Sequence, residues 1–495
     1  MERAVPRSRW VCWLPFIFVA LLGLAVRLPQ LGVRPMHTDE AINAYIVGQL
    51  LSGDPFTYDP QDRHGPALSA LALPLARMQG ARSFSDLTES ELRFTSVVAG
   101  TITVLLFGAG VELFGFLPCL IAALLFAFAP LPVYYDRYFI HESLFCAATF
   151  GLILSGWRAS KTNSVRDSVL VGACAALMLG SKETAVIHFC ALAVAALVLK
   201  ITKMYRSAST TRIRPRTLLI SCGTFLLFSV AAFTWFGRNW KALPALLQAI
   251  PDFFSRAAGQ GHEKPFWYFA HLLTGGWSGA LIVALGCVGV VVATKKTDSW
   301  SYRYLAIYFI FIAASYSLIP YKTPWLALNL WLPLALFAGC AVDFVWKTAI
   351  AHLPMQSAIP VFGILAAMVA SLLAHDIRQR VFVFPADVNN PFAYAHTTDD
   401  ILGLPLEISE LSQRNGIANP RIAVIASDPW PLPWYLRHFS QVGFWQPGEQ
   451  PGDADFYVTS SDAAAQYSDR LRSYRPDFFG VRPGVLVLLW LPMPK

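Results

Sequence analysis

The sequence predicts an α-helical membrane protein with about eleven transmembrane helices and a small mixed α/β domain at its C-terminal end. Three observations support this fold class. Of the 495 residues, 55% are hydrophobic and only 14% are charged, whereas soluble proteins carry about 25% charged residues. The hydrophobic residues fall in blocks of roughly 17–25, the length that crosses a hydrocarbon core. The end of the chain instead contains short β-rich runs.

Eleven hydrophobic segments are candidate membrane spans. They cover residues 10–28, 92–113, 117–133, 143–158, 167–181, 185–202, 217–237, 277–294, 303–320, 325–346 and 358–375. We therefore expect residues 1–375 to form a transmembrane domain and residues 376–495 to form an α/β domain outside the membrane. Three runs in the second part, at 421–426, 455–458 and 485–489, have β-strand composition, and Leu404 to Gln413 fits a helix.

Positive charge orients the spans. Basic residues Arg3, Arg7 and Arg9 precede the first span, which has no small-x-small cleavage site and predicts an uncleaved anchor. With the N-terminus in the cytoplasm, the three most basic connectors also lie there, as the positive-inside rule requires. These connectors are residues 158–166, 203–216 and 295–303. The remaining connectors then face the outside: 29–91, 134–142, 182–184, 238–276, 321–324 and 376–495. We expect a multi-pass protein of the cytoplasmic membrane whose active site faces the periplasm or exterior.

Charge and cysteine content exclude two classes of function. The net charge is +8, but the basic residues cluster between hydrophobic blocks, so we expect membrane lipids and no nucleic acid as partners. All eight cysteines lie in hydrophobic segments and none forms a CxxC pair. They are expected to pack as small hydrophobic residues without a disulfide framework.

A short helix is predicted over residues 39–52, directly after the first span. Apolar residues recur at helical spacing from Ile42 to Leu50, Asp39 could cap the start, and Gly53 fits just past the end. About three turns are too few to cross a membrane, so we expect this helix to lie along the interface.

The adjacent acids Asp39 and Glu40 begin this helix on the first outer loop. Sugar transfer from a phosphate leaving group to a hydroxyl needs a carboxylate that takes the acceptor proton. Two acids here could supply this base or bind a metal. The alternative is that Asp39 only caps the helix and Glu40 is a favourable charge in its first turn.

A second cluster, Tyr134-Tyr-Asp-Arg-Tyr-Phe-Ile-His-Glu142, lies between the third and fourth spans. If this segment is helical, Arg137 and His141 share a face. The tyrosines also fit an interfacial aromatic belt. A belt does not explain Asp136, Arg137 and Glu142 together, because ionisable groups near spans are costly and usually functional.

Two further outer turns carry a lysine. Gly180-Ser-Lys-Glu-Thr184 places Lys182 beside an acid, either as a site or as a self-neutralising hairpin tip. In Tyr321-Lys-Thr-Pro-Trp325, Lys322 could snorkel to the interface or reach a lipid phosphate.

Two loops of the C-terminal part are rich in aromatic and polar residues. They are Asn389 to Asp400 and Ser427 to Arg437, and the second contains Trp430 and Trp434. Exposed aromatic rings in these loops suit stacking on a sugar, and they equally suit docking onto the membrane.

A divalent-metal site is a weaker hypothesis. Several histidines fall on the outer side, among them His37, His64, His141, His396 and His438. His37, Asp39 and His141 are the candidate ligands for such an ion. No HxxxH or CxxC spacing supports this site, and single histidines are more often satisfied hydrogen-bonding groups.

The motifs together resemble the GT-C superfamily of membrane glycosyltransferases, in plan closest to the protein O-mannosyltransferases and the aminoarabinose transferase of lipid A. Within it the chain looks similar to the prokaryotic flippase activity-associated family. The resemblance runs through His37-Thr-Asp-Glu40, Tyr58-Asp-Pro60, His64-Gly-Pro66, Arg137-Tyr-Phe-Ile-His-Glu142, Ser181-Lys-Glu-Thr184, Tyr321-Lys-Thr-Pro-Trp325 and Asp428-Pro-Trp-Pro-Leu-Pro-Trp-Tyr-Leu436.

The resemblance implies a polyprenyl-phosphate sugar as donor and a lipid, glycan or protein hydroxyl as acceptor. By motif position Asp39 would be the general base, and Glu40 would assist it or help bind Mg or Mn. Candidate contacts to the donor phosphate or substrate are Asp136, Arg137, Glu142, Lys322, Arg238, His64 and Lys182. Candidate sugar or acceptor contacts are Tyr58, Trp325, Trp430 and Trp434. Other proteins of a glycosylation pathway would be partners.

An alternative function is a transporter or a non-catalytic flippase partner that handles lipid-linked sugars. Transporters usually show internal repeats and charged or broken helices near the bilayer midplane. Mid-span charges are scarce in this sequence and no repeat is visible. A purely structural assembly protein would leave the acid pairs on the outer loops without a purpose.

Overall fold

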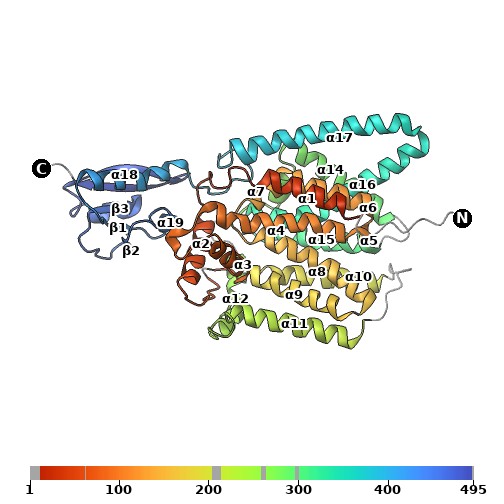
Figure 1. Cartoon of the computed structure of the whole chain (residues 1–495), viewed down its shortest axis with the longest axis horizontal. Coiled ribbons are helices and arrows are strands. Elements are labelled where there is room, and N and C mark those ends of the chain that lie inside the picture. The colour runs from red at the N-terminus through yellow and green to blue at the C-terminus, as the bar shows by residue number, and fades with distance from the viewer. Residues whose placement is uncertain (1–11, 62, 203–212, 258–262, 296–299, 493–495) are drawn as a thin grey trace. The chain divides into compact units, whose positions relative to one another are not determined.

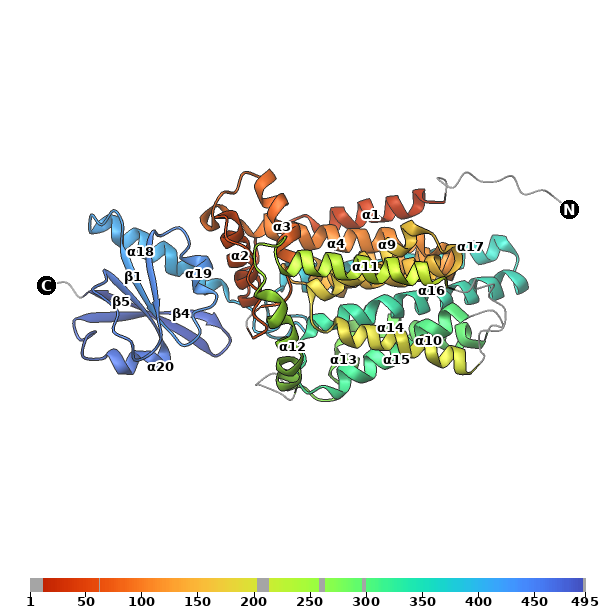
Figure 2. The same cartoon turned by 90° about the horizontal axis from the view of Figure 1, so that it is seen from below.

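A computed structural model describes residues 12–61, 63–202, 213–257, 263–295 and 300–492 (Figures 1 and 2). The basic residues Arg3, Arg7 and Arg9 and those at 203–212 lie outside the described residues. The chain divides into two compact units. Unit 1 comprises Met1–Pro29, Pro55–Leu71 and Arg93–Phe384, and unit 2 comprises Gln30–Asp54, Ala72–Leu92 and Pro385–Lys495. The predicted division at residue 375 does not foresee the two early stretches of unit 2.

Unit 1 is helical. Its helices are α1 (Leu14–Arg27), α5 (Val111–Phe114), α6 (Phe116–Phe128), α7 (Pro130–Asp136), α8 (Glu142–Thr162), α9 (Val165–Ser181), α10 (Ala185–Ile201), α11 (Pro215–Phe233), α12 (Ala242–Ala257), α13 (Tyr268–Leu273), α14 (Gly276–Lys295), α15 (Trp300–Leu318), the 3-10 turn η2 (Pro324–Leu326), α16 (Ala327–His352), α17 (Met355–Ile377) and the π-helical turn η3 (Arg378–Val383). Helices α3 (Ala67–Met78) and α4 (Glu89–Ala109) begin or end in unit 2.

The helical segments fit a multi-pass membrane protein. Among the described residues, five helical segments are long and apolar enough to cross a bilayer: α4, α11, α14, Pro324–His352 and Met355–Val383. A sixth results if α6 and α7, which are bent by 59°, form one broken span. Each of the eleven predicted spans coincides with a helix. The number eleven stays a prediction, because several of these helices are shorter than the roughly 20 residues that span a bilayer.

Helix α16 forms the core of unit 1. Every residue of its first part, Ala327–Ala341, is buried. It packs against α6 and α14, while α9 packs against α8 and α11 (Figure 1). A Cβ atom at Gly289 of α14 would overlap the backbone of Phe337 in α16. Glycine therefore lets these two backbones approach closely, as in other membrane helix pairs.

Unit 2 contains a five-stranded sheet with the strand order β2-β1-β3-β5-β4. The strands are β1 (Arg421–Ile425), β2 (Gln441–Trp445), β3 (Phe456–Ser460), β4 (Tyr474–Arg482) and β5 (Val485–Pro492). Strand β1 runs parallel to β2 and β3, with Ala423 paired to Gly443 and to Tyr457. Strand β5 is antiparallel to β3 and β4. The three predicted strands coincide with β1, β3 and β5.

Short helices complete unit 2. They are α2 (Thr38–Leu51), α18 (Gly403–Arg414), α19 (Leu432–Tyr435), α20 (Ser461–Ala464) and the 3-10 turns η1 (Phe84–Asp86), η4 (Asp399–Leu402) and η5 (Ala465–Tyr467). Helices α18 and α20 cover opposite faces of the sheet (Figure 2). The helix predicted from Leu404 to Gln413 is α18.

Helix α2 corrects two details of the sequence prediction. Its N-cap is His37, so Asp39 lies inside the first turn and does not cap the helix. The helix is buried on several sides, including its polar residues Glu40 and Asn43, and therefore lacks the single apolar face expected of an interfacial helix. Gly53 follows the helix with a positive φ of 98°, as its position predicted.

Candidate functional site

The two acids at the start of α2 have different environments. The Asp39 side chain is 45% exposed, whereas Glu40 is fully buried. Glu40 Oε2 accepts a hydrogen bond from the His37 backbone N–H at 3.2 Å, and its Oε1 lies 3.8 Å from the Arg34 guanidinium. Glu40 thus completes a capping box and an ion pair. Asp39 is the acid with a carboxylate open to a reactant.

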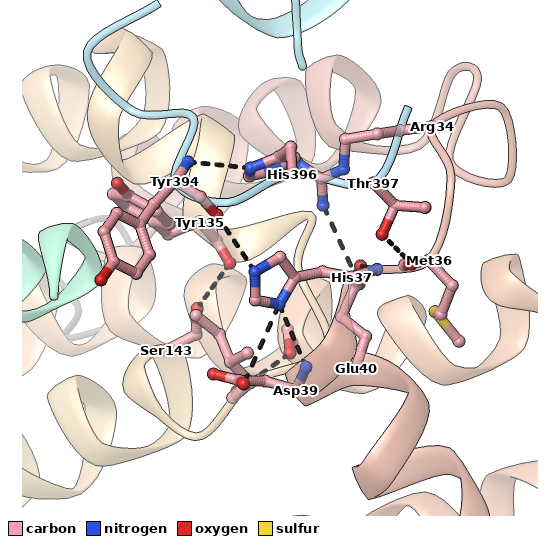
Figure 3. A network of polar contacts seen from close by, with 12 residues as sticks. Arg34, Met36, His37, Asp39, Glu40, Tyr135, Ser143, Tyr394, His396 and Thr397 are labelled. Carbon is pink, nitrogen blue, oxygen red and sulfur yellow. Dashed lines mark hydrogen bonds and ion pairs between the residues drawn. The ribbon is translucent and has the colours of Figure 1, made fainter. Parts of the chain in front are cut away.

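His37 connects this helix start to the second half of the chain. Its Nδ1 accepts the Asp39 backbone N–H at 3.0 Å, and its Nε2 lies 3.1 Å from the carbonyl oxygen of Tyr394 (Figure 3). Its ring also lies 5.5 Å from the ring of His396. Burial lowers the pKa of His37, and the nearby carboxylates of Asp39 and Glu40 only partly offset this. Both ring nitrogens are thus engaged by the protein.

Three more hydrogen bonds fix the residue before His37. The Met36 N–H donates to the Tyr435 hydroxyl at 2.7 Å, and that hydroxyl lies 3.3 Å from the Met36 carbonyl oxygen. Thr397 Oγ1 donates to the same carbonyl at 2.8 Å (Figure 3). The two aromatic loops of the C-terminal part therefore hold the Asp39 loop in place. The sequence predicted these loops as sugar or membrane contacts and did not predict this role.

The loop after β1 contacts α2, since the ring of Trp430 packs against that of Tyr45. It leaves the carboxyl end of a parallel strand, where the loops of such sheets commonly build sites. Arg482 at the end of β4 donates to Thr38 Oγ1 at 3.3 Å and forms an ion pair with Asp428 at 3.2 Å. The sheet thus supports the first turn of α2 through two separate segments.

Within unit 1, Asp136 and Arg137 have structural partners. Asp136 forms a fully buried ion pair with Arg27 of α1 at 2.8 Å. Arg137 Nη1 donates to the carbonyl oxygens of Arg27 and Pro29, both at 2.6 Å, and its guanidinium lies over the ring of Phe382. Arg137 therefore caps the C-terminal end of α1, and its charge is already used by the fold.

Three predicted outer loops meet around Glu183. Its carboxylate accepts a hydrogen bond from the Tyr58 hydroxyl at 2.8 Å and lies 2.8 Å from His64 Nδ1. Burial alone would raise the pKa of Glu183, but the charge of His64 and the hydrogen bonds from His64 and Tyr58 outweigh it and lower the pKa to about 2. Glu183 therefore stays ionised at all physiological pH values. Glu183 was not among the predicted site residues.

Lys182 and Glu142 form a buried ion pair next to this group. One interpretation of the sequence was a self-neutralising pair of Lys182 and Glu183, but the two side chains have different partners. His141 lies between the pairs, with its ring 5.1 Å from that of His64. Burial, followed by the positive charges of His64 and Lys182, lowers the pKa of His141 well below its usual value.

Lys322 lies between α15 and η2. Its Nζ donates to the carbonyl oxygens of Ile319 at 2.6 Å and Lys264 at 3.0 Å, and burial lowers its pKa. An ammonium has three N–H donors. Lys322 therefore caps these two carbonyl oxygens and has one further donor. Arg238 is exposed in the turn after α11. These two predicted phosphate contacts therefore differ strongly in burial.

The four predicted sugar contacts are mostly buried. Trp434 is fully buried, donates to Glu89 at 2.8 Å and stacks on Arg437. Trp325 and Tyr58 are also buried. These three rings hold the protein together and offer no open face for a sugar. Trp430, which is partly buried and packs edge-on against Tyr45, is the one of the four that keeps an accessible ring.

The residues suggested as metal ligands do not fit a metal site. His37 uses both ring nitrogens in hydrogen bonds, as described above. Among the residues that the structure describes, no group of three or more His, Cys, Asp or Glu side chains lies close enough to hold an ion. Binding of Mg or Mn stays a prediction.

Comparison with known proteins indicates the fold. The family described as "Dolichyl-phosphate-mannose-protein mannosyltransferase" matches residues 79–235, less than half of the chain. No curated protein matches the sequence. ArnT from Cupriavidus metallidurans bound to undecaprenyl phosphate is similar with a TM-score of 0.64 and 16% identity, over 97% of this chain and 98% of that chain.

Two further structures are similar at lower scores. The oligosaccharyltransferase AglB from Archaeoglobus fulgidus, in complex with an inhibitory peptide and a dolichol-phosphate, has a TM-score of 0.56 and 13% identity, over 97% of this chain and 74% of that chain. The arabinofuranosyltransferase AftD from Mycobacteria has a TM-score of 0.51 and 14% identity, over 99% of this chain and 40% of that chain. The chain therefore shares the fold of ArnT and AglB, in agreement with the resemblance predicted from the motifs.

Proposed function

We propose that the protein is an integral-membrane glycosyltransferase that moves a sugar from a polyprenyl-phosphate donor to a hydroxyl of a lipid, glycan or protein. The fold supports this proposal, since it is shared with ArnT bound to undecaprenyl phosphate and AglB bound to a dolichol-phosphate. The matching family description also names a dolichyl-phosphate sugar and a protein acceptor. The reaction would take place on the outer face of the cytoplasmic membrane, where the charge pattern of the connectors puts the acidic loops.

In this proposal Asp39 is the general base. The acceptor oxygen attacks the anomeric carbon, its proton passes to the Asp39 carboxylate, and the bond between that carbon and the phosphate oxygen breaks. The observation that carries this assignment is the contrast between two adjacent acids. Asp39 is open, and Glu40 is committed to His37 and Arg34. A base must reach its substrate, so only Asp39 of this pair qualifies.

The Asp39 carboxylate is also well positioned to act. It lies in the first turn of α2, where the helix N-terminus stabilises its charged form. The hydrogen bonds of His37, Met36 and Thr397 fix this turn against the C-terminal loops. A fixed base loses little entropy when the substrate arrives, which is a substantial part of catalytic power.

The test is sugar transfer by the purified protein in lipid bilayers, with radiolabelled polyprenyl-phosphate sugars and a membrane extract as acceptor. Asp39→Asn should lower the transfer rate by at least about a hundredfold, the usual contribution of a general base. Asp469→Asn, at an exposed acid of unit 2 that pairs only with exposed Arg472, should transfer at the wild-type rate. Normal transfer by Asp39→Asn would exclude this mechanism. Flipping of the labelled lipid without transfer would favour the transporter alternative.

A further inference from the structure

The two edges of the sheet in unit 2 differ in how they are protected. Strand β4 forms one edge, and it contains Pro476 and a register shift between Gly480 and Arg482. Thr398 also covers the end of this strand, since its N–H donates to the Val481 carbonyl at 3.0 Å. Proline, irregular register and cover by a neighbouring segment are common ways in which proteins prevent another chain from pairing with an edge strand.

Strand β2 forms the other edge and, within the described part of the chain, has none of these three protections. Its residues Gln441–Trp445 include no proline and no charged side chain, and they pair with β1 in an unbroken register. The Phe444 side chain is 41% exposed. The connection after β2 is held by η5 instead, because the Gly448 N–H donates to the Tyr467 hydroxyl at 3.0 Å. The edge formed by β2 is therefore open to pairing.

The backbone of Val442 and Phe444 faces away from the sheet. The Ala426 N–H donates to the Trp445 carbonyl at 3.2 Å, so the backbone groups of Trp445 face β1. Successive residues of a strand turn these groups to opposite sides. Val442 and Phe444 therefore present two N–H and two C=O groups at the edge. Among the residues that the structure describes, none forms a hydrogen bond with these four groups.

The open edge runs between a hollow and the end of the sheet that contacts α2. A hollow of about 320 Å³ lies at the start of β1 and β2, where Arg421 and Gln441 line it. Since β1 and β2 are parallel, the other end of β2 lies on the same side of the sheet as the loop after β1. That loop contacts α2 through the rings of Trp430 and Tyr45. A segment along β2 therefore leads from the hollow toward the helix that carries Asp39.

We propose that β2 binds an extended segment of an acceptor protein, which joins the sheet as a sixth strand. The role as acceptor rests on the proposed function, in which a protein hydroxyl is one of three acceptor classes. A polypeptide fits this edge because a strand offers N–H and C=O groups at the spacing of those of Val442 and Phe444. Backbone hydrogen bonds hold the segment, and the hollow receives one of its side chains.

The probe is a fluorescently labelled peptide of alternating threonine and valine with a lysine at each end. Its valines match the apolar side chains of Val442 and Phe444, which share one face of the sheet. Its threonines supply the hydroxyl groups of an acceptor. Binding is measured by fluorescence anisotropy with the full-length protein in lipid nanodiscs, and empty nanodiscs give the background.

Variants of the two sheet edges test where the peptide binds. Val442→Pro removes an outward N–H and keeps the bonds to β1, a position at which sheets tolerate proline. It should weaken peptide binding by about tenfold, the contribution of one backbone hydrogen bond. Phe444→Lys places a charge on the edge and should also weaken binding. Phe478→Lys, at a 61% exposed phenylalanine of β4, is the matched control and should bind like wild type.

Methylated peptides test the strand geometry on the unaltered protein. Because the backbone groups of a strand alternate in direction, N-methyl groups on one set of residues should block binding, and those on the other set should not. The valines are the sensitive set if the peptide runs antiparallel to β2, and the threonines are the sensitive set if it runs parallel. A hydrophobic contact without strand pairing would make the two sets equal.

Three outcomes would overturn the inference. Val442→Pro could bind the peptide as wild type does, or the two sets of methyl groups could have the same effect. The third outcome is that the edge pairs with a second copy of the chain. This pairing would be seen as a dimer in detergent that Val442→Pro converts to a monomer.

Failure of this inference and failure of the proposed function are distinguishable. Peptide binding that depends on Val442 without any sugar transfer would leave the docking edge intact and remove the enzymatic assignment. Transfer to a lipid that requires Asp39, together with no peptide binding at β2, would do the reverse.

Discussion

Arg27 and Asp136 form an ion pair in which both side chains are fully buried, with Nη2 and Oδ2 2.8 Å apart. Nε–H also donates to Asp136, and the other guanidinium hydrogens reach the carbonyl oxygens of Gly23, Phe126 and Ala127 at 3.0, 2.9 and 2.8 Å. The last two carbonyls are unpaired because α6 ends there: Pro130 has no N–H to bond to Phe126. Arg27 therefore replaces the missing helical hydrogen bonds at the bend between α6 and α7.

Removing this arginine should destabilise unit 1 strongly. Arg27→Met leaves the Asp136 carboxylate buried without its partner and the α6 carbonyls without donors, which should cost about 3–5 kcal/mol. The measurement is the thermal unfolding midpoint in detergent. Arg166→Met, at an exposed arginine of α9, should unfold like wild type. Adding Asp136→Leu to Arg27→Met should recover part of the loss, and no loss in the single variant would contradict the assigned role.

Substitutions at Asp39 and Glu40 should lower the stability of the protein to different extents. Glu40→Ala removes the capping-box acceptor and the partner of Arg34, so we expect a loss of about 1–2 kcal/mol. Asp39→Asn removes an exposed charge and should cost less than about 1 kcal/mol. Chemical unfolding of both variants, monitored by tryptophan fluorescence, checks the order. Equal losses would show that Asp39 is also a structural residue.

His37 should make stability depend on pH. Burial lowers its pKa in the folded state, so near pH 6 the unfolded chain binds more protons on this residue. Stability from this group is complete above the unfolded value of about 6.5 and falls as the pH drops below it. His37→Asn can still cap the helix but has no such titration. The unfolding midpoint of wild type should therefore fall more steeply than that of His37→Asn as the pH is lowered from about 7.5 to 5.

Hydrophobic patterning was enough to predict the long helices and three of the five strands, but not α12 and α13. The segment at 325–346, for example, is almost entirely apolar and becomes most of the core helix α16. Strand β2 was missed because Gly443 interrupts its pattern and none of its residues is fully buried. The folding of residues 30–54 with the C-terminal sheet could not be predicted either, since hydrogen bonds such as Met36 to Tyr435 join positions far apart in sequence.

Several residues of the candidate site could be identified from the sequence, but the roles of most of them could not. Asp39 was singled out because sugar transfer needs a carboxylate base, Lys182 because it lies beside an acid in an outer turn, and His64 because of the family resemblance. Arg137 was also singled out, but its partners are backbone carbonyls, which leave no trace in a sequence pattern. Glu183 was overlooked because it follows Lys182 directly, and adjacent opposite charges suggest a pair. Only the fold shows that the two side chains serve different partners.

Trp430 and Trp434 should differ in what their loss affects. Trp434 is fully buried, so Trp434→Ala should cost about 3–5 kcal/mol of stability. Trp430 is partly exposed, and Trp430→Ala should leave most of the stability intact. If its ring contacts the acceptor, the same variant should raise KM for the acceptor while KM for the donor is unchanged. Unfolding and steady-state transfer assays on both variants provide the comparison, and a stable Trp434→Ala protein would contradict the assignment of this ring to the core.

Gly65 should tolerate no side chain. A Cβ atom there would overlap the carbonyl of Gly180 at the end of α9, and this backbone cannot move aside as a flexible side chain could. Gly65→Ala should therefore displace the loop that carries His64 and weaken both stability and phosphate binding. Gly223→Ala in α11 has open space around the new methyl group and should be neutral or slightly stabilising. A wild-type unfolding midpoint and wild-type phosphate binding in Gly65→Ala would show that the close approach of these two backbones is not needed for the site.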